Sequence, residues 1–352
     1  MWRKSWPVAL RASAMVENAH AMLPSGPGVV KSRRGGMGLV ATRDISPGDR
    51  VAFLAKDDIF DAENVYKRSQ NPLIAMIKEA LEGYAGLKEA QPAAFGELEL
   101  ALLLWAERRS LDPSSGCSNS PWNDWLKDLP DNCATSAAFL TDNLLDQMVC
   151  IDKGFSSENM DDLKKEVKVY NHVIDVFTEN IGEDLLSAFT IIEGNENLLW
   201  GRGDPDKQAW PFNELFREEL SLVGSRAYNL SRVRASIGPD RVCLPGVNDV
   251  CLFTGIDFFN HSRQPNTDVV ITSQPKTEPG QVLTEFNEPA VSVIANTHIA
   301  KDEELTICYS RGSGRQMLFR YGFVEPGVPM MPQEEEYPTV LKVKNLDWEK
   351  AQ

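Results

Sequence analysis

Two short β-rich stretches near the ends of the chain enclose a long helical middle, and this order is the strongest constraint on the fold. Residues 36–54 contain two β-rich runs around the turn Ser46-Pro47-Gly48-Asp49. Residues 291–309 repeat this pattern, with strands expected at 291–295 and 305–309 around a polar turn. The aligned pairs are Ala41 and Ala295, Ile45 and Ile299, Asp49 and Glu303, and Val51 and Leu305. The weak repeat indicates either similar turn chemistry or two small sheets that pack together.

The middle of the chain has helical periodicity. Within residues 158–181, after a candidate N-cap at Ser157, apolar side chains recur at steps of three and four, which predicts one buried stripe. The stripe consists of Leu163, Val167, Tyr170, Ile174, Phe177 and Ile181. Further helices are predicted at 92–109, 213–222 and 316–321. Together with the β-rich ends, this pattern favours an α+β fold in which an α-helical insert interrupts a β domain.

Composition excludes several classes of protein. The 352 residues include 36 basic and 51 acidic side chains, giving a net charge of −15. An acidic chain is unsuited to broad binding of a nucleic-acid backbone and attracts basic partners instead. No apolar run approaches the roughly 20 residues of a transmembrane helix, so no membrane association is expected. The six cysteines show no C-x-x-C spacing and histidines number only four, so no metal site is expected.

Three motifs could carry chemistry, and each also has a purely structural interpretation. The glycines around Met37 either let a backbone approach a ligand or make a tight turn. Residues 257–266 form either a loop that binds a ligand or a turn capped by asparagines. The aromatic side chains of Tyr309, Tyr321 and Phe323 line a pocket or belong to the core.

The order and joint spacing of these motifs resemble the SET domain. They comprise Gly36-Met37-Gly38-Leu39, the Asn-His-Ser-x-x-Pro-Asn motif at 260–266, and Tyr309 followed by Tyr321-Gly322-Phe323. Within that family the chain is similar to the group typified by the Rubisco large-subunit methyltransferase. Two further stretches carry this similarity, residues 120–130 and Ser225-Arg226-Ala227-Tyr228, as does the helical insert.

The resemblance covers roughly residues 25–325 and implies a division of the chain. We expect an N-terminal segment at 1–24, the first SET part at 25–105, the helical insert at 106–224, the second SET part at 225–325 and a loose tail at 326–352. The implied fold is a set of small β-sheets around a pseudoknot. The family's C-terminal helical docking domain is expected to be absent or reduced to the tail.

The implied activity is that of a protein-lysine N-methyltransferase that uses S-adenosyl-L-methionine. We expect a monomer whose partner is a non-histone protein substrate. Members of the family occupy several compartments. The expected location is therefore cytoplasmic or nuclear, with the plastid as the alternative.

The resemblance also assigns residues. Tyr309 matches the catalytic tyrosine. The positions matching cofactor contacts are Gly35, Gly36, Met37, Gly38, Arg226, Asn260, His261, Tyr309 and Phe323. The positions matching substrate contacts are Tyr228, Asp257 and Tyr321.

Some residues depart from the family pattern. Ser310 stands in place of a usual glycine, Gly314 in place of an asparagine that caps the next helix, and Gln316 in place of a glutamate. Ser313 is the expected substitute cap. Two alternatives remain open, a protein-histidine methyltransferase and a non-catalytic SET-fold binding protein. Tyr228 favours lysine, because the family member that acts on histidine has a small polar residue there.

Overall fold

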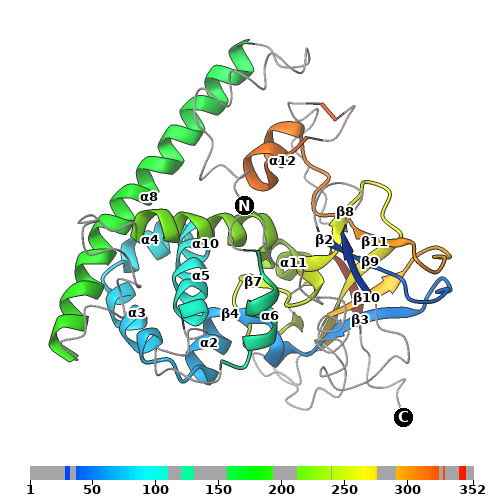
Figure 1. Ribbon diagram of the computed structural model, residues 1–352, viewed down its shortest axis with the longest axis horizontal. Coiled ribbons are helices and arrows are strands. Elements are labelled where there is room, and N and C mark those ends of the chain that lie inside the picture. The colour runs from blue at the N-terminus through cyan, green and yellow to red at the C-terminus, as the bar shows by residue number, and fades with distance from the viewer. Residues whose placement is uncertain are drawn as a thin grey trace.

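The computed structural model places a helical half beside a half built from three small β-sheets (Figure 1). It describes residues 28–31, 37–109, 120–130, 157–192, 212–238, 240–275, 291–324, 328–329 and 341–345. The α-helices are α2 (Ala62–Arg68), α3 (Pro72–Glu82), α4 (Ala85–Ala90), α5 (Pro92–Arg109), α6 (Asn123–Asp128), α8 (Ser157–Ile192), α10 (Phe212–Arg226), α11 (Ser231–Ser236) and α12 (Gly314–Tyr321). Two 3₁₀ turns, η1 (Lys56–Asp58) and η4 (Ile256–Phe258), accompany them.

The strands form sheets of four, five and three strands. They are β1 (Gly28–Lys31), β2 (Met37–Val40), β3 (Arg50–Leu54), β4 (Phe60–Asp61), β5 (Tyr228–Asn229), β6 (Arg241–Cys243), β7 (Val250–Leu252), β8 (Asn260–His261), β9 (Thr267–Pro275), β10 (Val291–Ala295), β11 (Glu304–Ile307) and β12 (Lys342–Asn345). The orders are β1-β2-β11-β8, β12-β9-β10-β3 with β6 also paired to β9, and β4-β7-β5.

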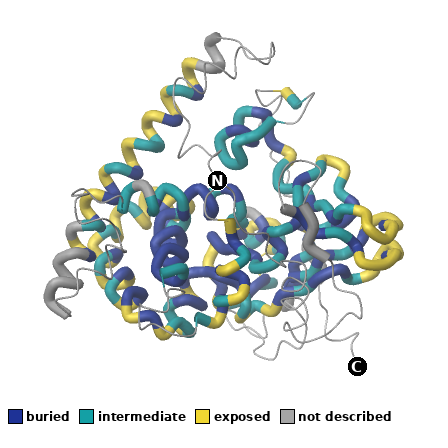
Figure 2. Tube along the Cα trace, in the orientation of Figure 1, coloured by how far each residue is buried: buried dark blue, intermediate teal, exposed yellow. Residues whose placement is uncertain are grey.

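Helix α5 is the centre of the helical half. Proline at its first position loses no helical hydrogen bond, and Arg108 and Arg109 in its last turn suit the negative end of the helix dipole. From Leu98 to Glu107 every residue is buried, so this part of the helix has no solvent face, whereas Pro92, Ala93 and Ala94 in the first turn are exposed (Figure 2). The uninterrupted apolar run of the sequence therefore forms a stretch of helix that is covered on all sides.

The helical periodicity is confirmed by the structure. Helix α5 has the predicted bounds, and α8 includes the predicted 158–181 but continues to Ile192. Along α8 the predicted stripe is buried except for Tyr170, which is intermediate. Helices α10 and α12 each extend beyond the predicted ranges by a few residues.

Backbone hydrogen bonds join the two β-rich units to each other. Ile45 and Ile299 exchange both backbone hydrogen bonds, at 2.8 and 3.0 Å. On either side, the Ala41 amide donates to Glu303 and the Ala295 amide donates to Asp49, each at 2.9 Å. The repeat therefore reflects two similar units, but they do not form two separate sheets that pack together, since β2 pairs with β11 in one sheet and β3 pairs with β10 in another.

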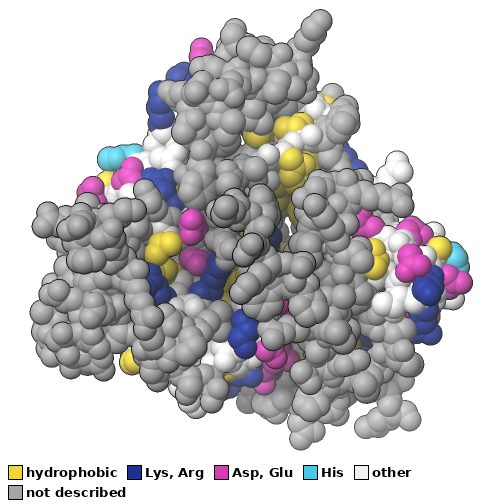
Figure 3. All heavy atoms as spheres, viewed as in Figure 1, with side chains coloured by type: hydrophobic (Ala, Val, Ile, Leu, Met, Phe, Trp, Pro, Cys, Tyr) yellow, Lys and Arg dark blue, Asp and Glu magenta, His cyan; other side chains and the backbone are white. Residues whose placement is uncertain are grey.

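The turns of the two units also correspond. Gly48 has a φ of +88° and Asp302 a φ of +66°, so both turns use the left-handed region. The Asp49 carboxylate accepts the amide of residue 46, and the Glu303 carboxylate accepts the amide of residue 300. These turns are exposed, and their acidic and basic side chains gather at the right-hand end of the view in Figure 3.

Several elements differ from the sequence predictions. The tail was predicted to lie loosely on the surface, but its residues Lys342–Asn345 form β12, which pairs in parallel with β9. Helix α11 and the helices α2, α3 and α4 were not predicted. The predicted insert limits at 105/106 and 224/225 fall inside α5 and α10, and the domain division remains a prediction. Among the described helices, none has the length and apolarity needed to cross a bilayer.

The side chain of Asn266 forms two hydrogen bonds with the backbone of β11, and their contribution to stability can be tested. Its Nδ2 donates to the Glu304 carbonyl at 2.8 Å, and its Oδ1 accepts the Thr306 amide at 2.9 Å. Asn266→Ala leaves two backbone groups unpaired, so we expect the free energy of unfolding to fall by about 2–4 kcal/mol. Asn296→Ala is the matched control, since Asn296 is exposed and donates once to the Pro265 carbonyl. Urea denaturation of both variants measures the difference, and equal losses would contradict the assignment.

Candidate active site

Strand β11 brings the separated motifs together. It pairs antiparallel with β2 through Leu305 and Leu39, and parallel with β8 through Thr306 with Asn260 and Ile307 with His261. The glycine motif, the Asn-His motif and the segment that leads to Tyr309 therefore share one small sheet.

Gly38 is required by the side chains opposite it. Asn260 Nδ2 donates to Glu304 Oε1 at 2.6 Å, and this pair crosses directly over Gly38. A Cβ atom at Gly38 would lie 2.3 Å from the Asn260 nitrogen and 2.8 Å from the Glu304 oxygen. The glycine thus leaves room for a polar pair, and its role is space rather than an unusual φ.

His261 is buried and orders the backbone at Tyr309. Its Nδ1 accepts the Tyr309 amide hydrogen at 3.0 Å, which assigns the neutral tautomer with hydrogen on Nε2. The imidazole ring lies 5.2 Å from the Tyr309 ring and 5.8 Å from the Phe323 ring. The histidine therefore connects the Asn-His motif to the aromatic cluster.

The aromatic cluster is held by hydrogen bonds at both ends. The Tyr309 hydroxyl donates to the Phe259 carbonyl at 2.5 Å, and the Tyr321 hydroxyl donates to the Tyr309 carbonyl at 3.3 Å. The rings of Tyr309 and Tyr321 are 5.3 Å apart, and Tyr321 is 6.0 Å from Phe323. Burial raises the pKa of Tyr321 above its usual range, so its hydroxyl is neutral near pH 7.

Helix α12 carries Tyr321, and Ser313 caps it as predicted. The Ser313 hydroxyl accepts the amide of Gln316, and Gly322 ends the helix with a φ of +71°. Ser310 also has a local role, since its hydroxyl accepts the Gly312 amide at 2.9 Å. The departures from the family pattern therefore leave an ordered turn before the helix.

A cavity of about 30 Å³ lies between this cluster and the end of α10. It is lined by Ser225, Arg226, Ala227, Tyr228, Asp257, Ile307, Tyr309 and Tyr321. Tyr228 stacks on Phe253 with ring centroids 4.3 Å apart, which fixes this wall. Burial raises the pKa of Tyr228 well above its usual value, so its hydroxyl is neutral near pH 7.

Asp257 and Arg226 give the cavity its charges. The Asp257 carboxylate accepts the Trp125 indole N–H at 3.1 Å and the Gly255 amide at 2.9 Å. Arg226 Nε lies 3.8 Å from the same carboxylate and is buried with no hydrogen-bond partner. Burial raises the pKa of Asp257 to about 6, while Arg226 and Trp125 oppose that shift.

Five of the predicted residues therefore meet in one cavity, namely Arg226, Tyr228, Asp257, Tyr309 and Tyr321. Gly38, Asn260, His261 and Phe323 lie in the adjoining sheet and cluster. Gly35 and Gly36 lie outside the described residues, and of Met37 only the backbone in β2 is described.

Sequence reasoning missed two polar contacts. Glu304 contacts Asn260, and Trp125 contacts Asp257. Both Glu304 and Trp125 lie in or beside segments that the sequence analysis singled out, but no local sequence pattern predicts these two contacts. In the described part of the chain, no group of histidine, cysteine or acidic side chains is arranged to hold a metal ion.

Comparison with known families matches residues 36–310 to the SET domain, so this chain belongs to the SET domain family. Among curated protein sequences the search finds no match. The expected α+β SET fold and the likeness to the Rubisco methyltransferase group are both confirmed.

Solved structures show the same fold at low sequence identity. Rubisco LSMT bound to AdoMet aligns with a TM-score of 0.54 and 17% identity, over 92% of this chain and 57% of that one. The SET domain of LSMT bound to lysine and AdoHcy aligns with a TM-score of 0.53 and 16% identity, over 91% and 58%. This chain therefore spans less than two thirds of these relatives.

The raised pKa of Asp257 predicts a pH dependence of stability. Between the ordinary aspartate pKa of 3.8 and about 6, the folded protein keeps a proton that the unfolded chain has released. Stability conferred by protonated Asp257 is therefore lost as the pH rises through this window. Asp257→Asn lacks this loss, so its stability relative to the parent should rise by up to about 3 kcal/mol between pH 4 and pH 7.

Denaturant unfolding at a series of pH values measures this difference. Asp302→Asn is the matched control, because Asp302 is exposed and asparagine tolerates its positive φ. A pH-independent difference between Asp257→Asn and the parent would contradict the assignment.

Proposed function

We propose that this protein is a protein-lysine N-methyltransferase that uses S-adenosyl-L-methionine and acts on a non-histone protein. The observation that carries the proposal is the cavity in which Tyr228, Tyr309 and Tyr321 converge beside Asp257. Membership of the SET domain family and structural relatives crystallised with lysine, AdoHcy or AdoMet support it.

The residues around Gly38 fit the cofactor. Gly38 has no side chain, and the Asn260–Glu304 pair lies over it, so the Asn260 amide is held beside this stretch of backbone. The buried Nε of Arg226 needs an acceptor, which suits an amino-acid carboxylate. We propose that these residues, with Met37, His261 and Phe323, hold S-adenosylmethionine, and that Gly35 and Gly36, which precede Met37 in the sequence, contribute to the same site. When bound, the cofactor supplies an electrophilic methyl group on a sulfonium.

The aromatic walls prepare the substrate amine. A lysine is protonated in water, with a pKa of about 10.4, and must lose a proton to act as a nucleophile. The cavity between Tyr228, Tyr309 and Tyr321 removes the amine from water, which favours its neutral form.

Tyr309 orients that amine. Its hydroxyl hydrogen is committed to the Phe259 carbonyl, so its oxygen is left to accept an N–H of the lysine. Two hydrogen bonds fix the position of Tyr309, because its hydroxyl donates to the Phe259 carbonyl and its backbone amide donates to His261. Alignment of this kind supplies much of the rate in a displacement reaction.

Lysine is favoured over histidine by the wall at Tyr228. The ring of Tyr228 is stacked on Phe253, which narrows the channel and offers a π face to a cation. The non-catalytic alternative arose because Gly314 replaces the asparagine that usually caps the next helix in this family. Ser313 caps α12 instead, which argues against that alternative.

Labelling a methyl-deficient extract with tritiated S-adenosylmethionine, followed by mass spectrometry of the product, tests this function. We expect methyllysine in a protein other than a histone. Methylhistidine without methyllysine would establish the histidine alternative. Cofactor binding without any labelled product would establish the non-catalytic one.

Cofactor binding depends on the Asn260–Glu304 pair. S-adenosylhomocysteine should bind the parent and raise its melting temperature. Asn260→Ala should weaken binding by about 1–3 kcal/mol through the lost hydrogen bond. Gly38→Ala should act in the same direction, because its Cβ displaces the Asn260 amide. Titration calorimetry measures both, with Asn296→Ala as control, and parental affinity in both site variants would rule out this pocket.

Turnover depends on the Tyr309 hydroxyl. Tyr309→Phe keeps the ring between His261 and Tyr321 but removes the oxygen that accepts from the amine. We expect the rate of methyl transfer to fall by about 10²–10³, with cofactor affinity nearly unchanged. Single-turnover assays on the labelled substrate measure this rate. An unchanged rate would mean that the tyrosine is structural.

A further inference from the structure

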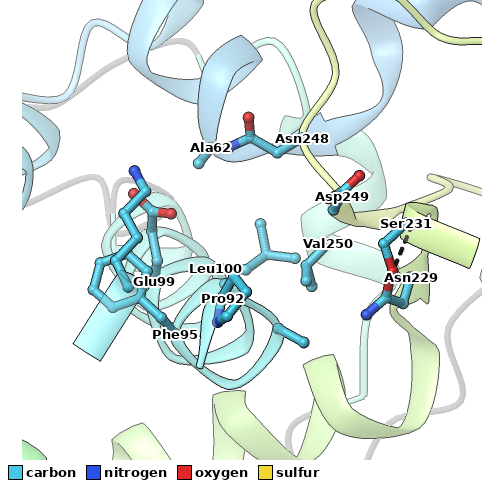
Figure 4. Close-up of a pocket in the computed structure, with 13 residues that line it drawn as sticks. Ala62, Pro92, Phe95, Glu99, Leu100, Asn229, Ser231, Asn248, Asp249 and Val250 are labelled. Atoms are coloured by element: carbon cyan, nitrogen blue, oxygen red, sulfur yellow. Dashed lines mark hydrogen bonds between the residues drawn. The ribbon is translucent and has the colours of Figure 1, made fainter. Parts of the chain in front are cut away.

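A second cavity, of about 230 Å³, lies outside this site, between α5 and the end of β5 (Figure 4). Its walls come from α5, from the start of α2, from β5 and α11, and from the segment that leads into β7. Sites for drug-sized ligands have volumes of roughly 300–1,000 Å³. The size of this cavity therefore suits one side chain better than a whole cofactor.

Glu99 is a buried carboxylate that lines this cavity. Its exposed fraction is 7%, and the Tyr66 hydroxyl donates to its Oε1 at 2.7 Å. Burial raises its pKa, and the positive charge of Lys88 lies near enough to oppose that shift. Within the described residues Glu99 forms no salt bridge, since its hydrogen-bond partner is a neutral hydroxyl. A carboxylate shielded from water without a paired cation is costly, so a cation entering the cavity would be stabilised.

The other walls suit the remainder of a basic side chain. The side-chain amide of Asn248 supplies an acceptor oxygen, while Phe95 and Val250 are apolar (Figure 4). The Asp249 carboxylate is already paired with Arg234 at 2.6 Å, and the Asn229 oxygen already accepts from Ser231. The Lys88 ammonium lies 5.6 Å from the Phe95 ring centroid, so this wall already accommodates a cation. Lys88 itself is exposed, and an incoming side chain can displace it.

The two cavities lie on opposite faces of β5. Asn229, paired with Val250, lines the second cavity, whereas Tyr228, paired with Cys251, lines the first. Strand β5 is at the end of its sheet in the order β4-β7-β5. Successive side chains of an extended polypeptide point to opposite sides. A polypeptide that passes this edge therefore presents neighbouring residues to the two cavities in turn.

We propose that this second cavity binds a lysine or arginine side chain of the polypeptide substrate, an odd number of residues from the target lysine. Glu99 pairs with the charged group, and Phe95 and Val250 contact its alkyl chain. The net charge of −15 favours such a basic substrate. This assignment rests on the proposed function for its substrate but not for its chemistry, because the cation site is defined by this chain alone.

Direct binding tests the site without any methyl transfer. The probes are Nα-acetyl-arginine amide and Nα-acetyl-lysine amide, with Nα-acetyl-norleucine amide as the uncharged control. In ²H,¹⁵N-labelled protein we expect both cations, but not the control, to shift the amide resonances of Gly96, Asn229 and Asn248. Shifts elsewhere only, or equal shifts with norleucine, would overturn the proposal.

Two variants, one expected to weaken cation binding and one expected to strengthen it, test which residues form the site. Glu99→Gln keeps an acceptor for Tyr66 but removes the charge, so we expect affinity for the cations to fall about tenfold. Glu89→Gln is the matched control, because Glu89 is an exposed carboxylate on α4 that does not line the cavity. Lys88→Ala removes the competing cation and should strengthen binding. Equal affinity in Glu99→Gln and the parent would overturn the proposal.

Peptide methylation then tests the link to the substrate. Peptides with one target lysine and one arginine, placed one to four residues away on either side, are compared by kcat/KM. The parent should prefer arginine at odd distances, and Glu99→Gln should lose this preference while methylating arginine-free peptides as before. Methylation without any preference overturns the inference. Cation binding without methylation of any peptide or extract protein overturns the proposed function and leaves the cation site in place.

Discussion

The pairing of β11 with two strands of different direction is the constraint on which the site depends. Its antiparallel contact with β2 places Glu304 over Gly38, and its parallel contact with β8 sets Ile307 beside His261. The chain after β11 therefore reaches Tyr309 at a fixed position, where the His261 ring accepts its amide. Asn266 secures the same strand with two side-chain hydrogen bonds to its backbone. One short strand thus positions Gly38, the Asn-His motif and the aromatic cluster.

Helix α12 connects this sheet to the helical half. It carries Tyr321 into the first cavity, and its outer side chains reach α5 and α8: Arg320 pairs with Glu97 at 2.8 Å and Arg315 pairs with Glu166 at 2.6 Å. The Tyr170 and Phe319 rings, 5.2 Å apart, add an edge-to-face contact between α8 and α12. The position of one cavity wall therefore depends on helices that lie outside the sheets (Figure 1). Substitutions in the insert are expected to act on the site through this helix.

Two buried carboxylates lie on either side of β5, and each is held by an aromatic donor. Asp257 accepts from the Trp125 indole on the side of the first cavity, and Glu99 accepts from the Tyr66 hydroxyl on the other. Burial raises the pKa of both, so each is costly to ionise alone and each is stabilised by a cation. Arg226 already faces Asp257, whereas the cation proposed for Glu99 comes from the substrate.

Local patterns in the sequence predicted the helices α5, α8, α10 and α12 and the two similar β units, but not α2, α3, α4 or α11. The periodicity that predicts α5 and α8, and the turn chemistry of the two β units, depend on residues that are neighbours in the chain. Motif spacing identified the family and the five residues of the first cavity. Tertiary structure alone decided that β12 joins β9, that Glu304 orients Asn260 and that Trp125 holds Asp257. The tertiary structure also decided that Glu99 lines a second cavity. These contacts join residues far apart in the chain, and their geometry arises only when the sheets and helices pack, so no local pattern encodes them.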